Sequence, residues 1–247
     1  MELFYVIVAL IAGSVGSVGL AALMLLLPDR KLDNLATLLM YLAGGTLLGA
    51  AFLGMMPKGI SMIGARPMMM AVLGGIMFFF VLEKIILWRT CGNAECERHK
   101  HAAVPIILIG DAFHNAIDGI VIAASFLTSF ELGVFATLSV MMHEIPQELG
   151  DFGILLKSGL SRKKAIWFNI LSGSTALLTG IIAYYTLEAM QSLIPYALAL
   201  SAASFLYIAL ADLIPEMHRK SSVKSSLIQF GLILTGILLI YIILIIK

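Results

Sequence analysis

Two long apolar stretches, separated by four residues, decide how this chain folds. Residues 103–127 read AVPIILIGDAFHNAIDGIVIAASFL, and residues 132–156 read LGVFATLSVMMHEIPQELGDFGILL. Each exceeds the roughly 20 mostly apolar residues that an α-helix needs to cross a bilayer. Each also holds acidic residues and a histidine, which are costly against lipid and therefore face a bundle interior or a wet cavity. The stretches predict two membrane-spanning helices that direct polar side chains into the protein.

Apolar runs of the same length continue on both sides of these stretches. The 247-residue chain is 60% hydrophobic and 13% charged, with a mean hydropathy of +1.01, whereas a soluble protein carries about 25% charged residues. The first run is too long for the apolar core of a cleaved signal peptide. We expect an all-α polytopic membrane protein that forms one domain over residues 1–247. Its eight transmembrane helices are expected at about 4–27, 35–56, 67–88, 103–127, 132–156, 165–187, 196–215 and 226–246.

Basic residues between the spans predict the orientation of the chain. Twelve follow the first, third, fifth and seventh spans: Arg30, Lys31, Arg89, Arg98, Lys100, Lys157, Arg162, Lys163, Lys164, Arg219, Lys220 and Lys224. The other breaks and the C-terminus hold only Lys58, Arg66 and Lys247. Because cytoplasmic loops are enriched in lysine and arginine, we expect both termini outside the cytoplasm, a cytoplasmic loop at 89–102, and a plasma (inner) membrane location. A net charge of +1 gives no reason to expect a nucleic-acid partner.

The polar residues of the two central spans fall on one face of each helix. At about 100° per residue, they cover an arc of roughly 100° in the first stretch and roughly 140° in the second. They are Asp111, His114, Asn115 and Asp118, and then His143, Glu144, Gln147, Glu148 and Asp151. The five carboxylates would cost on the order of 12–17 kcal/mol if charged and unpaired at mid-bilayer, and neither stretch holds a lysine or arginine. Either the acids are protonated or a cation from solution compensates them.

The side-chain types narrow this cation to a divalent transition metal. Imidazole suits Zn, Fe, Ni and Cu, whereas carboxylate and carbonyl oxygens alone suit Mg, Ca or Mn. The mixed set therefore favours Zn²⁺, Fe²⁺, Mn²⁺ or Cd²⁺. The expected ligands are His114, Asn115, Asp118, His143, Glu144, Gln147 and Glu148. Asp111 and Asp151, about a turn beyond the ends of this set, are candidates for handing the ion along.

Three segments resemble signatures of the ZIP family of zinc and iron transporters. Residues 114–119 (HNAIDG) match the form HNxxDG, and residues 143–151 (HEIPQELGD) differ from HEIPHELGD only at Gln147. Residues 206–216 (LYIALADLIPE) resemble the seventh span of the family and add Asp212 as a candidate on the path of the ion. The resemblance extends over the whole chain and is most specific in the two central spans.

The resemblance implies a transport site between the central spans with two adjacent metal positions. By motif, the first is lined by His114, Asp118 and the residue at 147, and the second by Asn115, His143 and Glu144, with Asp118 bridging. It also implies inverted three-helix repeats on either side of the central pair in a 3+2+3 arrangement, homodimers, and movement of metal into the cytosol. The metal is cargo, so we expect neither an enzyme nor a catalytic cofactor.

Two positions depart from the family pattern. Gln147 replaces a histidine or glutamate, and a neutral amide is a weak metal ligand that adds no charge. The second span ends in Met56-Pro57-Lys58 where the family has Leu-Pro-Glu, so an entrance carboxylate found in some relatives is missing. The first departure lowers the expected zinc affinity and leaves the preferred metal open.

The loop at 89–102 holds four potential metal ligands, Cys91, Cys96, His99 and His101, and resembles the metal-collecting loop of the family. The Cys-x4-Cys spacing differs from the C-x2-C usual in structural zinc sites, and a reducing cytosol disfavours a disulfide. Metal delivery or sensing is one interpretation of this loop, and an ordinary solvated loop is the other.

Two other functions fit part of the pattern. His143-Glu144 begins like the HExxH motif of metalloproteases, but the second histidine would be Gln147, and Pro146 distorts the turn between them. A proton-coupled cation antiporter would use the buried acids as relays. The two histidines and their spacing from the acids favour metal transport over both alternatives.

Overall fold

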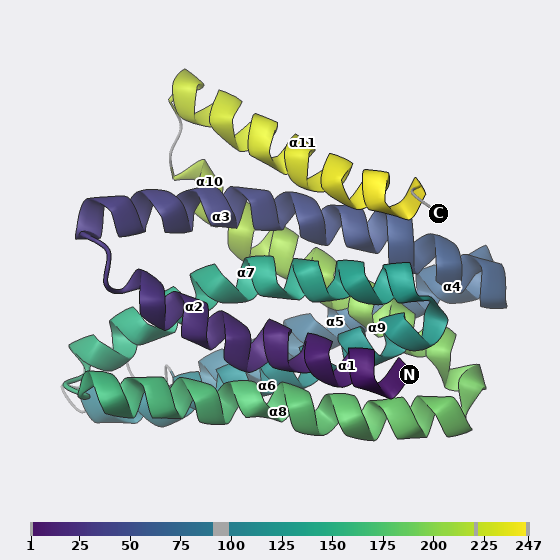
Figure 1. Ribbon diagram of the computed structural model, residues 1–247, viewed down its shortest axis with the longest axis horizontal. Coiled ribbons are helices and arrows are strands. Elements are labelled where there is room, and N and C mark those ends of the chain that lie inside the picture. The colour runs from purple at the N-terminus through teal and green to yellow at the C-terminus, as the bar shows by residue number, and fades with distance from the viewer. Residues whose placement is uncertain (1, 91–98, 220–221, 246–247) are drawn as a thin grey trace.

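The computed structural model describes residues 2–90, 99–219 and 222–245, and every regular element within these ranges is a helix. Figure 1 shows long helices gathered in one elongated bundle. In chain order the elements are α1 (Glu2–Ile11), η1 (Ala12–Gly16), α2 (Ser17–Met24), α3 (Asp29–Gly49), η2 (Ala50–Met55), α4 (Met56–Ile63), α5 (Ala65–Thr90), α6 (His99–Thr128), α7 (Phe130–Lys157), α8 (Arg162–Ala189), η3 (Gln191–Leu193), α9 (Ile194–Tyr207), η4 (Ile208–Leu213), α10 (Ile214–His218) and α11 (Val223–Ile245).

Three columns of the described chain are α-helices joined end to end through a short π-helix. α1 continues through η1 into α2, α3 through η2 into α4, and α9 through η4 into α10. α6 and α7, with 30 and 28 residues, are comparable in length to these columns and carry the polar stripes. Six described segments are long and apolar enough to cross a membrane: Leu3–Met24, Asp29–Ile63, Ala65–Ile85, Arg162–Ala189, Gln191–His218 and Val223–Ile245. The predicted all-α polytopic membrane protein is confirmed.

Several helices extend beyond their predicted ends into charged residues. α3 begins at Asp29, so the basic cluster at 29–31, predicted as a break, forms its first turn. An acid in this turn is favourable because the helix N-terminus carries partial positive charge. α8 begins at Arg162, behind Ser161, whose hydroxyl accepts a hydrogen bond from the backbone nitrogen of Lys164 at 3.5 Å. In both cases charged residues form the first turn of a helix rather than a loop, and at α8 that turn is capped by Ser161.

The segment predicted as a loop at 89–102 is helical at both of its ends. α5 continues to Thr90, and α6 begins at His99. The backbone of His99 and His101 is thus helical. Residues 99–102 hold no glycine or proline, which are the residues that disfavour a helix most strongly. Cys91 and Cys96 lie outside the described residues, so the metal-collecting role of this region stays a prediction.

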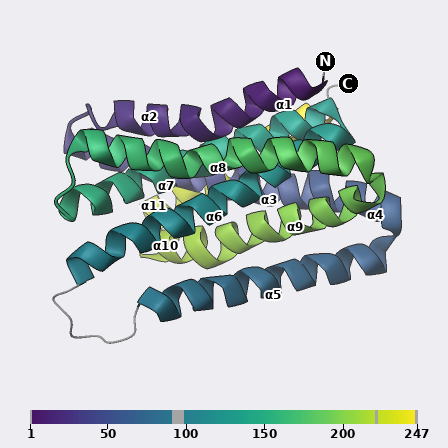
Figure 2. The ribbon, with the colours of Figure 1, turned by 90° about the horizontal axis from the view of Figure 1, so that it is seen from below.

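The two central helices are enclosed by the others. Figure 1 shows α7 between α3 and α2, and both flanking helices contact it. Figure 2 shows α6 between α8 and α9, with α5 beyond α9 at the edge of the bundle. This arrangement directs the polar stripes of α6 and α7 into the protein and away from lipid.

α6 is held closely against α8 by small and hydroxyl-bearing residues. A methyl group on Gly119 would collide with the backbone carbonyl oxygen of Ala176 in α8. Thr175 and Thr179 of α8 donate hydrogen bonds to backbone carbonyl oxygens of α6, at 2.7 and 2.8 Å. Small residues let helices approach closely in lipid. The close contact fixes the position of the stripe on α6.

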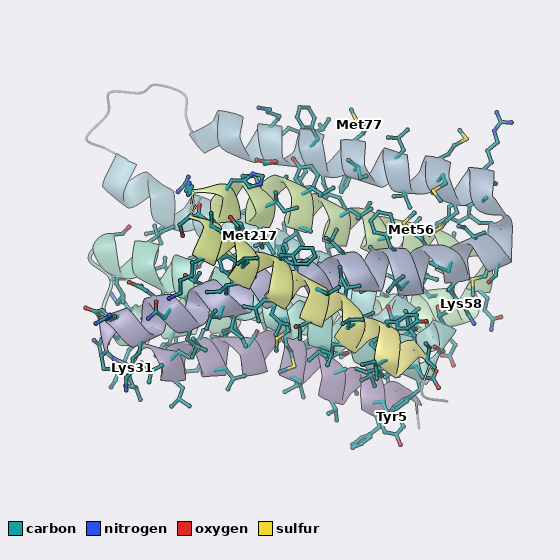
Figure 3. All side chains as sticks on the ribbon, turned by 90° about the horizontal axis from the view of Figure 1, so that it is seen from above. Tyr5, Lys31, Met56, Lys58, Met77 and Met217 are labelled. Atoms are coloured by element: carbon teal, nitrogen blue, oxygen red, sulfur yellow. The ribbon has the colours of Figure 1, made fainter. Side chains whose placement is uncertain are left out.

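Charged residues distinguish the two ends of the bundle. Figure 3 shows Lys31 at one end and Lys58, with Tyr5, at the other. The first end also carries the start of α8 with its basic residues at 162–164 and the end of α10 with Arg219, and it is called here the basic end. The opposite end is called the Lys58 end, and there α1 begins and α11 ends (Figure 1).

Large apolar side chains lie on the outside of the bundle and many polar side chains lie inside, which is the reverse of the distribution in a soluble protein. Large apolar side chains are exposed on the outer faces, among them Leu73, Trp167 and Phe230, at 61%, 70% and 67% exposure. The buried polar side chains include Asp111, Asn115, Asp118, Ser139, His143, Glu144, Glu148, Asn169, Ser201 and Ser204. Lipid therefore solvates the outside of this integral membrane protein, and the polar residues gather inside.

Candidate metal centre

The stripes of α6 and α7 meet because the two helices pack side by side in opposite directions. Asp111 lies in the first half of α6, and Glu148 in the second half of α7, yet both offer ligand oxygens to one group of acids. The sequence alone suggested that Asp111 and Asp151 lie beyond opposite ends of the site. Antiparallel packing instead directs both toward the basic end.

Four side chains converge between the helices and are called here the central group. His114 and Asp118 come from α6, and His143 and Glu144 come from α7. Asp118 and Glu144 are fully buried and His143 is 2% exposed, whereas His114 is partly exposed. Each helix thus supplies one imidazole and one carboxylate, and His114 is the member nearest to solvent.

The ligand atoms of the central group are spaced for one small ion. His143 Nε2 lies 3.0 Å from His114 Nε2, 3.1 Å from Asp118 Oδ2 and 4.0 Å from Glu144 Oε1. His114 Nε2 lies 3.7 Å from Asp118 Oδ2 and 3.5 Å from Glu144 Oε1. A tetrahedral zinc ion with N and O ligands at about 2.0–2.1 Å keeps those ligands about 3.3–3.4 Å apart. The observed separations bracket that value.

The ring of His143 is already oriented as a metal ligand. Its Nδ1 lies 2.8 Å from the backbone carbonyl oxygen of Ser139. A carbonyl oxygen only accepts, so Nδ1 carries the proton, and Nε2 presents a lone pair to the centre. The Ser139 hydroxyl donates to the carbonyl oxygen of Thr46 in α3 at 3.3 Å, which ties this turn of α7 to its neighbour. The tautomer that binds metal is therefore selected by the backbone.

The carboxylates of the central group lack hydrogen-bond donors. Within the described residues, neither oxygen of Asp118 or Glu144 has a hydrogen-bond partner. Asp118 Oδ2 does lie close to His143 Nε2, but that nitrogen presents a lone pair rather than a proton. Buried charges without partners are strongly unfavourable. Two carboxylates and two neutral imidazoles together match the charge of one divalent cation.

A second set of acids shares Glu144 with the central group. Asp111, Glu144 and Glu148 bring ligand oxygens within 4.8 Å of one another and are called here the acid group. Asp111 Oδ1 accepts hydrogen bonds from Asn115 Nδ2 at 2.9 Å and from Gln147 Nε2 at 3.3 Å. Asp111 Oδ2 and both oxygens of Glu148 have no hydrogen-bond partner in the described part of the chain. Two amides thus hold Asp111, and its other oxygen stays available.

The structure brings His143 together with His114, Asp118 and Glu144. The division of the expected ligands into two metal positions, which the family resemblance implies, stays a prediction. Asn115 and Gln147 both use their amide nitrogens to hold Asp111. Sequence spacing gives the face of a helix but not the partner that a side chain selects there. A ligand role for these two amides stays a prediction.

A cavity of about 210 Å³ reaches one member of the central group, His114. Its wall includes His114 of α6, Glu83 of α5, and Tyr207 and Asp212 of the α9–η4 column. The Tyr207 hydroxyl donates a hydrogen bond to Glu83 Oε2. Asp212, which the sequence suggested for the path of the ion, lies on the wall of this cavity, called here the His114 cavity, and is exposed.

Two polar residues near the site were not singled out in the sequence. Glu83 lies in an apolar span and lines the His114 cavity. Asn169 of α8 is fully buried, and its side-chain nitrogen and oxygen have no hydrogen-bond partner among the described residues. Polar residues inside spans are costly and rare, and that cost is the signal that marks both positions.

Comparison with known proteins gives matches over most of the chain. Residues 89–244 match the family model described as ZIP zinc transporter. The chain is 39% identical over 133 residues to the zinc transporter foi of Drosophila melanogaster and 36% identical over 126 residues to the zinc transporter ZIP10 of Danio rerio. It is 30% identical over 219 residues to the zinc transporter ZIP13 of Pongo abelii.

These matches differ in how much of each protein they cover. They include 54%, 51% and 83% of this chain, and 18%, 15% and 65% of the three relatives. The chain therefore spans less than two thirds of the length of each of these relatives. The family match itself extends over both polar stripes, the central group and the α9–η4 column. On this evidence the chain belongs to the ZIP zinc transporter family.

Proposed function

We propose that this protein carries Zn²⁺, or alternatively Fe²⁺, Mn²⁺ or Cd²⁺, across the membrane toward the cytosol. The observation that carries the proposal is the central group, with two imidazoles and two unpartnered carboxylates around a space for one ion. A mixed set of nitrogen and oxygen ligands suits these metals better than Mg²⁺ or Ca²⁺. The relatives named above are zinc transporters, which supports zinc as the first candidate.

The charge at the two ends supports an orientation of the protein, and transport toward the cytosol is proposed from the family resemblance. The excess of lysine and arginine supports a cytosolic basic end, with both termini outside, in a plasma (inner) membrane. The His114 cavity then faces the cytosol. Inverted repeats that move around a site near the bilayer midplane would expose it to each side in turn. A homodimer is proposed from the family resemblance alone.

The residues on the cytosolic side suggest how an ion leaves. His114 belongs to the central group and also lines the cavity, so an ion that moves past it meets Glu83 and Asp212 next. The acid group adjoins the central group through Glu144 and offers free oxygens of Asp111 and Glu148. These oxygens can take up the ion as it loses its imidazole ligands.

Asp118→Asn is expected to remove saturable Zn²⁺ uptake into proteoliposomes that contain the purified protein. The amide keeps the shape of the side chain but removes one of the two charges that balance the ion. Uptake of Zn²⁺, Fe²⁺, Mn²⁺ and Cd²⁺ should be compared in the wild type, in Asp118→Asn and in Asp33→Asn, an exposed acid of α3. Metal binding without flux would indicate a sensor. Flux that follows a pH gradient and ignores metal would indicate the proton-coupled antiporter.

Gln147→His is expected to tighten zinc binding about tenfold, or about 1.4 kcal/mol. The change adds an imidazole one turn from His143 and frees Asp111 Oδ1 from the Gln147 amide. The dissociation constant can be measured by competition with a chromophoric chelator. Gln147→Ala is the matched control, because it frees Asp111 without adding a ligand. Equal affinity of the wild type and Gln147→His would mean that residue 147 does not reach the ion.

The protease alternative finds no support at residue 147. The Gln147 side chain donates to Asp111, so it does not complete a metal-binding pair with His143. Membership of a transporter family also argues against an enzyme. We therefore propose that the metal is cargo and that no catalytic cofactor is involved.

A further inference from the structure

A cavity of about 420 Å³ lies at the Lys58 end of the bundle. Its lining comes from η2 and α4, from the start of α7, and from the end of α11. η2, α7 and α11 also contact one another. Figure 3 shows Lys58, which belongs to the lining, at this end of the molecule. The described residues that line the cavity include none of the expected metal ligands, so this cavity is separate from the central group and the acid group.

The polar part of the lining carries one charge of each sign. Lys58 lies near the start of α4, Glu131 lies in the first turn of α7, and both are exposed. Neither takes part in an ion pair within the described part of the chain, where the ion pairs involve other residues. The two side chains therefore do not neutralise each other across the cavity. A ligand that carries both signs of charge can contact both of them at once.

Two hydroxyl groups accompany these charges. The Ser61 hydroxyl of α4 donates a hydrogen bond to the backbone carbonyl oxygen of Lys58 at 2.6 Å. The Ser129 hydroxyl, which precedes α7, accepts one from the backbone nitrogen of Leu132 at 3.2 Å. A donating hydroxyl can still accept, and an accepting hydroxyl keeps its proton. The α4 wall and the α7 wall of the cavity thus each offer a donor and an acceptor.

The apolar part of the lining lies nearer to the middle of the membrane. Leu53 precedes Lys58 by five residues, or about 7 Å along the helix axis. Leu132 of α7 and Leu244 of α11 complete this part. Leu53 is 37% exposed, and Leu244 is half-buried, so other side chains do not cover them fully. Charged groups at the end of a spanning helix lie at the headgroup level, and the leucines below them lie in hydrocarbon.

The pairing of charges disfavours a metal ion as the occupant of this cavity. Glu131 would attract a divalent cation, but Lys58 would repel it, and the two charges sum to zero. An anion meets the opposite conflict. A zwitterion avoids both, and the adjoining leucines suit a ligand that continues into an apolar chain.

We propose that this cavity binds phosphatidylethanolamine, a zwitterionic phospholipid with a primary amine. The phosphate contacts Lys58, the ammonium group contacts Glu131, and the upper part of one acyl chain lies along the three leucines. A primary ammonium group donates charge-assisted hydrogen bonds to a carboxylate, whereas the quaternary ammonium group of phosphatidylcholine has no proton to donate. The lipid contacts three separate parts of the chain. The proposal goes beyond metal transport and does not depend on which ion is carried.

Fluorescence quenching by lipids with brominated acyl chains tests the preference at the cavity itself. Leu53→Trp places a reporter in the lining, and Leu244→Trp gives a second one. Brominated phosphatidylethanolamine should quench each reporter at about two- to fivefold lower mole fraction than brominated phosphatidylcholine, the size expected for an exposed ion pair. The parent protein, whose Trp167 is 70% exposed on α8, gives the level without preference. Equal quenching of both reporters by the two lipids would overturn the proposal.

A charge reversal in the Leu53→Trp background separates the roles of the two charges. Glu131→Gln should abolish the preference for the primary amine, and Lys58→Gln should weaken the quenching by both lipids. The double variant Lys58→Glu with Glu131→Lys should regain the preference, because the zwitterion can bind in the opposite orientation. Lys31→Gln, an exposed lysine of α3 at the basic end, is the matched control and should behave as the parent. A preference that survives Glu131→Gln would contradict the assignment.

Addition of zinc distinguishes a lipid site from an entrance for cations. Saturating Zn²⁺ should leave the lipid preference of the Leu53→Trp reporter unchanged, since Lys58 opposes a cation there. Loss of the preference in zinc would show that Glu131 receives the ion and would contradict the lipid site. Zinc uptake by the same variant is measured in parallel. A normal lipid preference without zinc uptake would contradict the proposed function and leave the lipid site supported.

Discussion

Glu144→Gln is expected to remove at least half of the stabilisation of the protein by zinc without destabilising the metal-free protein. A ligand that binds only the folded state adds about 2.7 kcal/mol of stability at 100 times its Kd. Glu144 belongs to both the central group and the acid group, and its oxygens have no hydrogen-bond partner in the described residues. Removing its charge therefore weakens zinc binding by at least about 10–100-fold, the loss that even outer-shell changes cause. The same change relieves a buried charge, so the metal-free variant should be at least as stable as the wild type.

The melting temperature in detergent, with and without zinc, measures both effects. Glu131→Gln is the matched control, because Glu131 lies exposed on the same helix. We expect zinc to raise the melting temperature of the wild type and of Glu131→Gln, and to raise that of Glu144→Gln by half as much or less. A zinc-dependent rise in Glu144→Gln equal to that of the wild type would exclude Glu144 as a ligand.

Gly119→Ala is expected to destabilise the protein by about 1–3 kcal/mol, the usual cost of overpacking. The added methyl group meets the backbone carbonyl oxygen of Ala176, which cannot move aside as a flexible side chain would. α6 must then shift away from α8, and Asp118, the residue before Gly119, shifts with it. We therefore expect weaker zinc binding in addition to a lower melting temperature.

Gly153→Ala gives the control of opposite sign. Gly153 lies in α7, and a methyl group there meets no atom within 4 Å. Alanine is favoured over glycine in helices by about 1 kcal/mol, so this variant should be slightly more stable than the wild type. If Gly119→Ala also raised the melting temperature, the close contact between α6 and α8 would not be essential to the fold.

The sequence predicts the spans and the polar faces well, because both follow from the cost of placing charge in lipid. His114 and Asp118 are four residues, or one helical turn, apart, so their shared face is visible in the spacing. The ends of the helices were less predictable. Charged residues such as those at 29–31 can stay helical at the membrane surface, and hydropathy does not distinguish a helical turn there from a loop.

The partners across helices could not be read from spacing. Gln147 and Asn115 both donate hydrogen bonds to Asp111, and spacing along one helix does not show that contact across two helices. Asn169 reaches the interior from α8 only once the helices are packed. The π-helical turns of η2 and η4 are likewise invisible to a pattern of apolar periodicity, since they change the hydrogen bonding and not the composition.

The length of the α3–η2–α4 column has a consequence for what can move in the membrane. Asp29–Ile63 comprises 35 residues, or about 52 Å at 1.5 Å per residue, whereas the hydrocarbon core is about 30 Å thick. Lys31 and Lys58 are about 40 Å apart along this axis, close to the full distance between the two headgroup layers. Sliding the column along the membrane normal would pull one ammonium group into hydrocarbon. The column is therefore anchored at both surfaces of the membrane. Bilayer thickness then affects the free energy needed for neighbouring helices to move relative to this column.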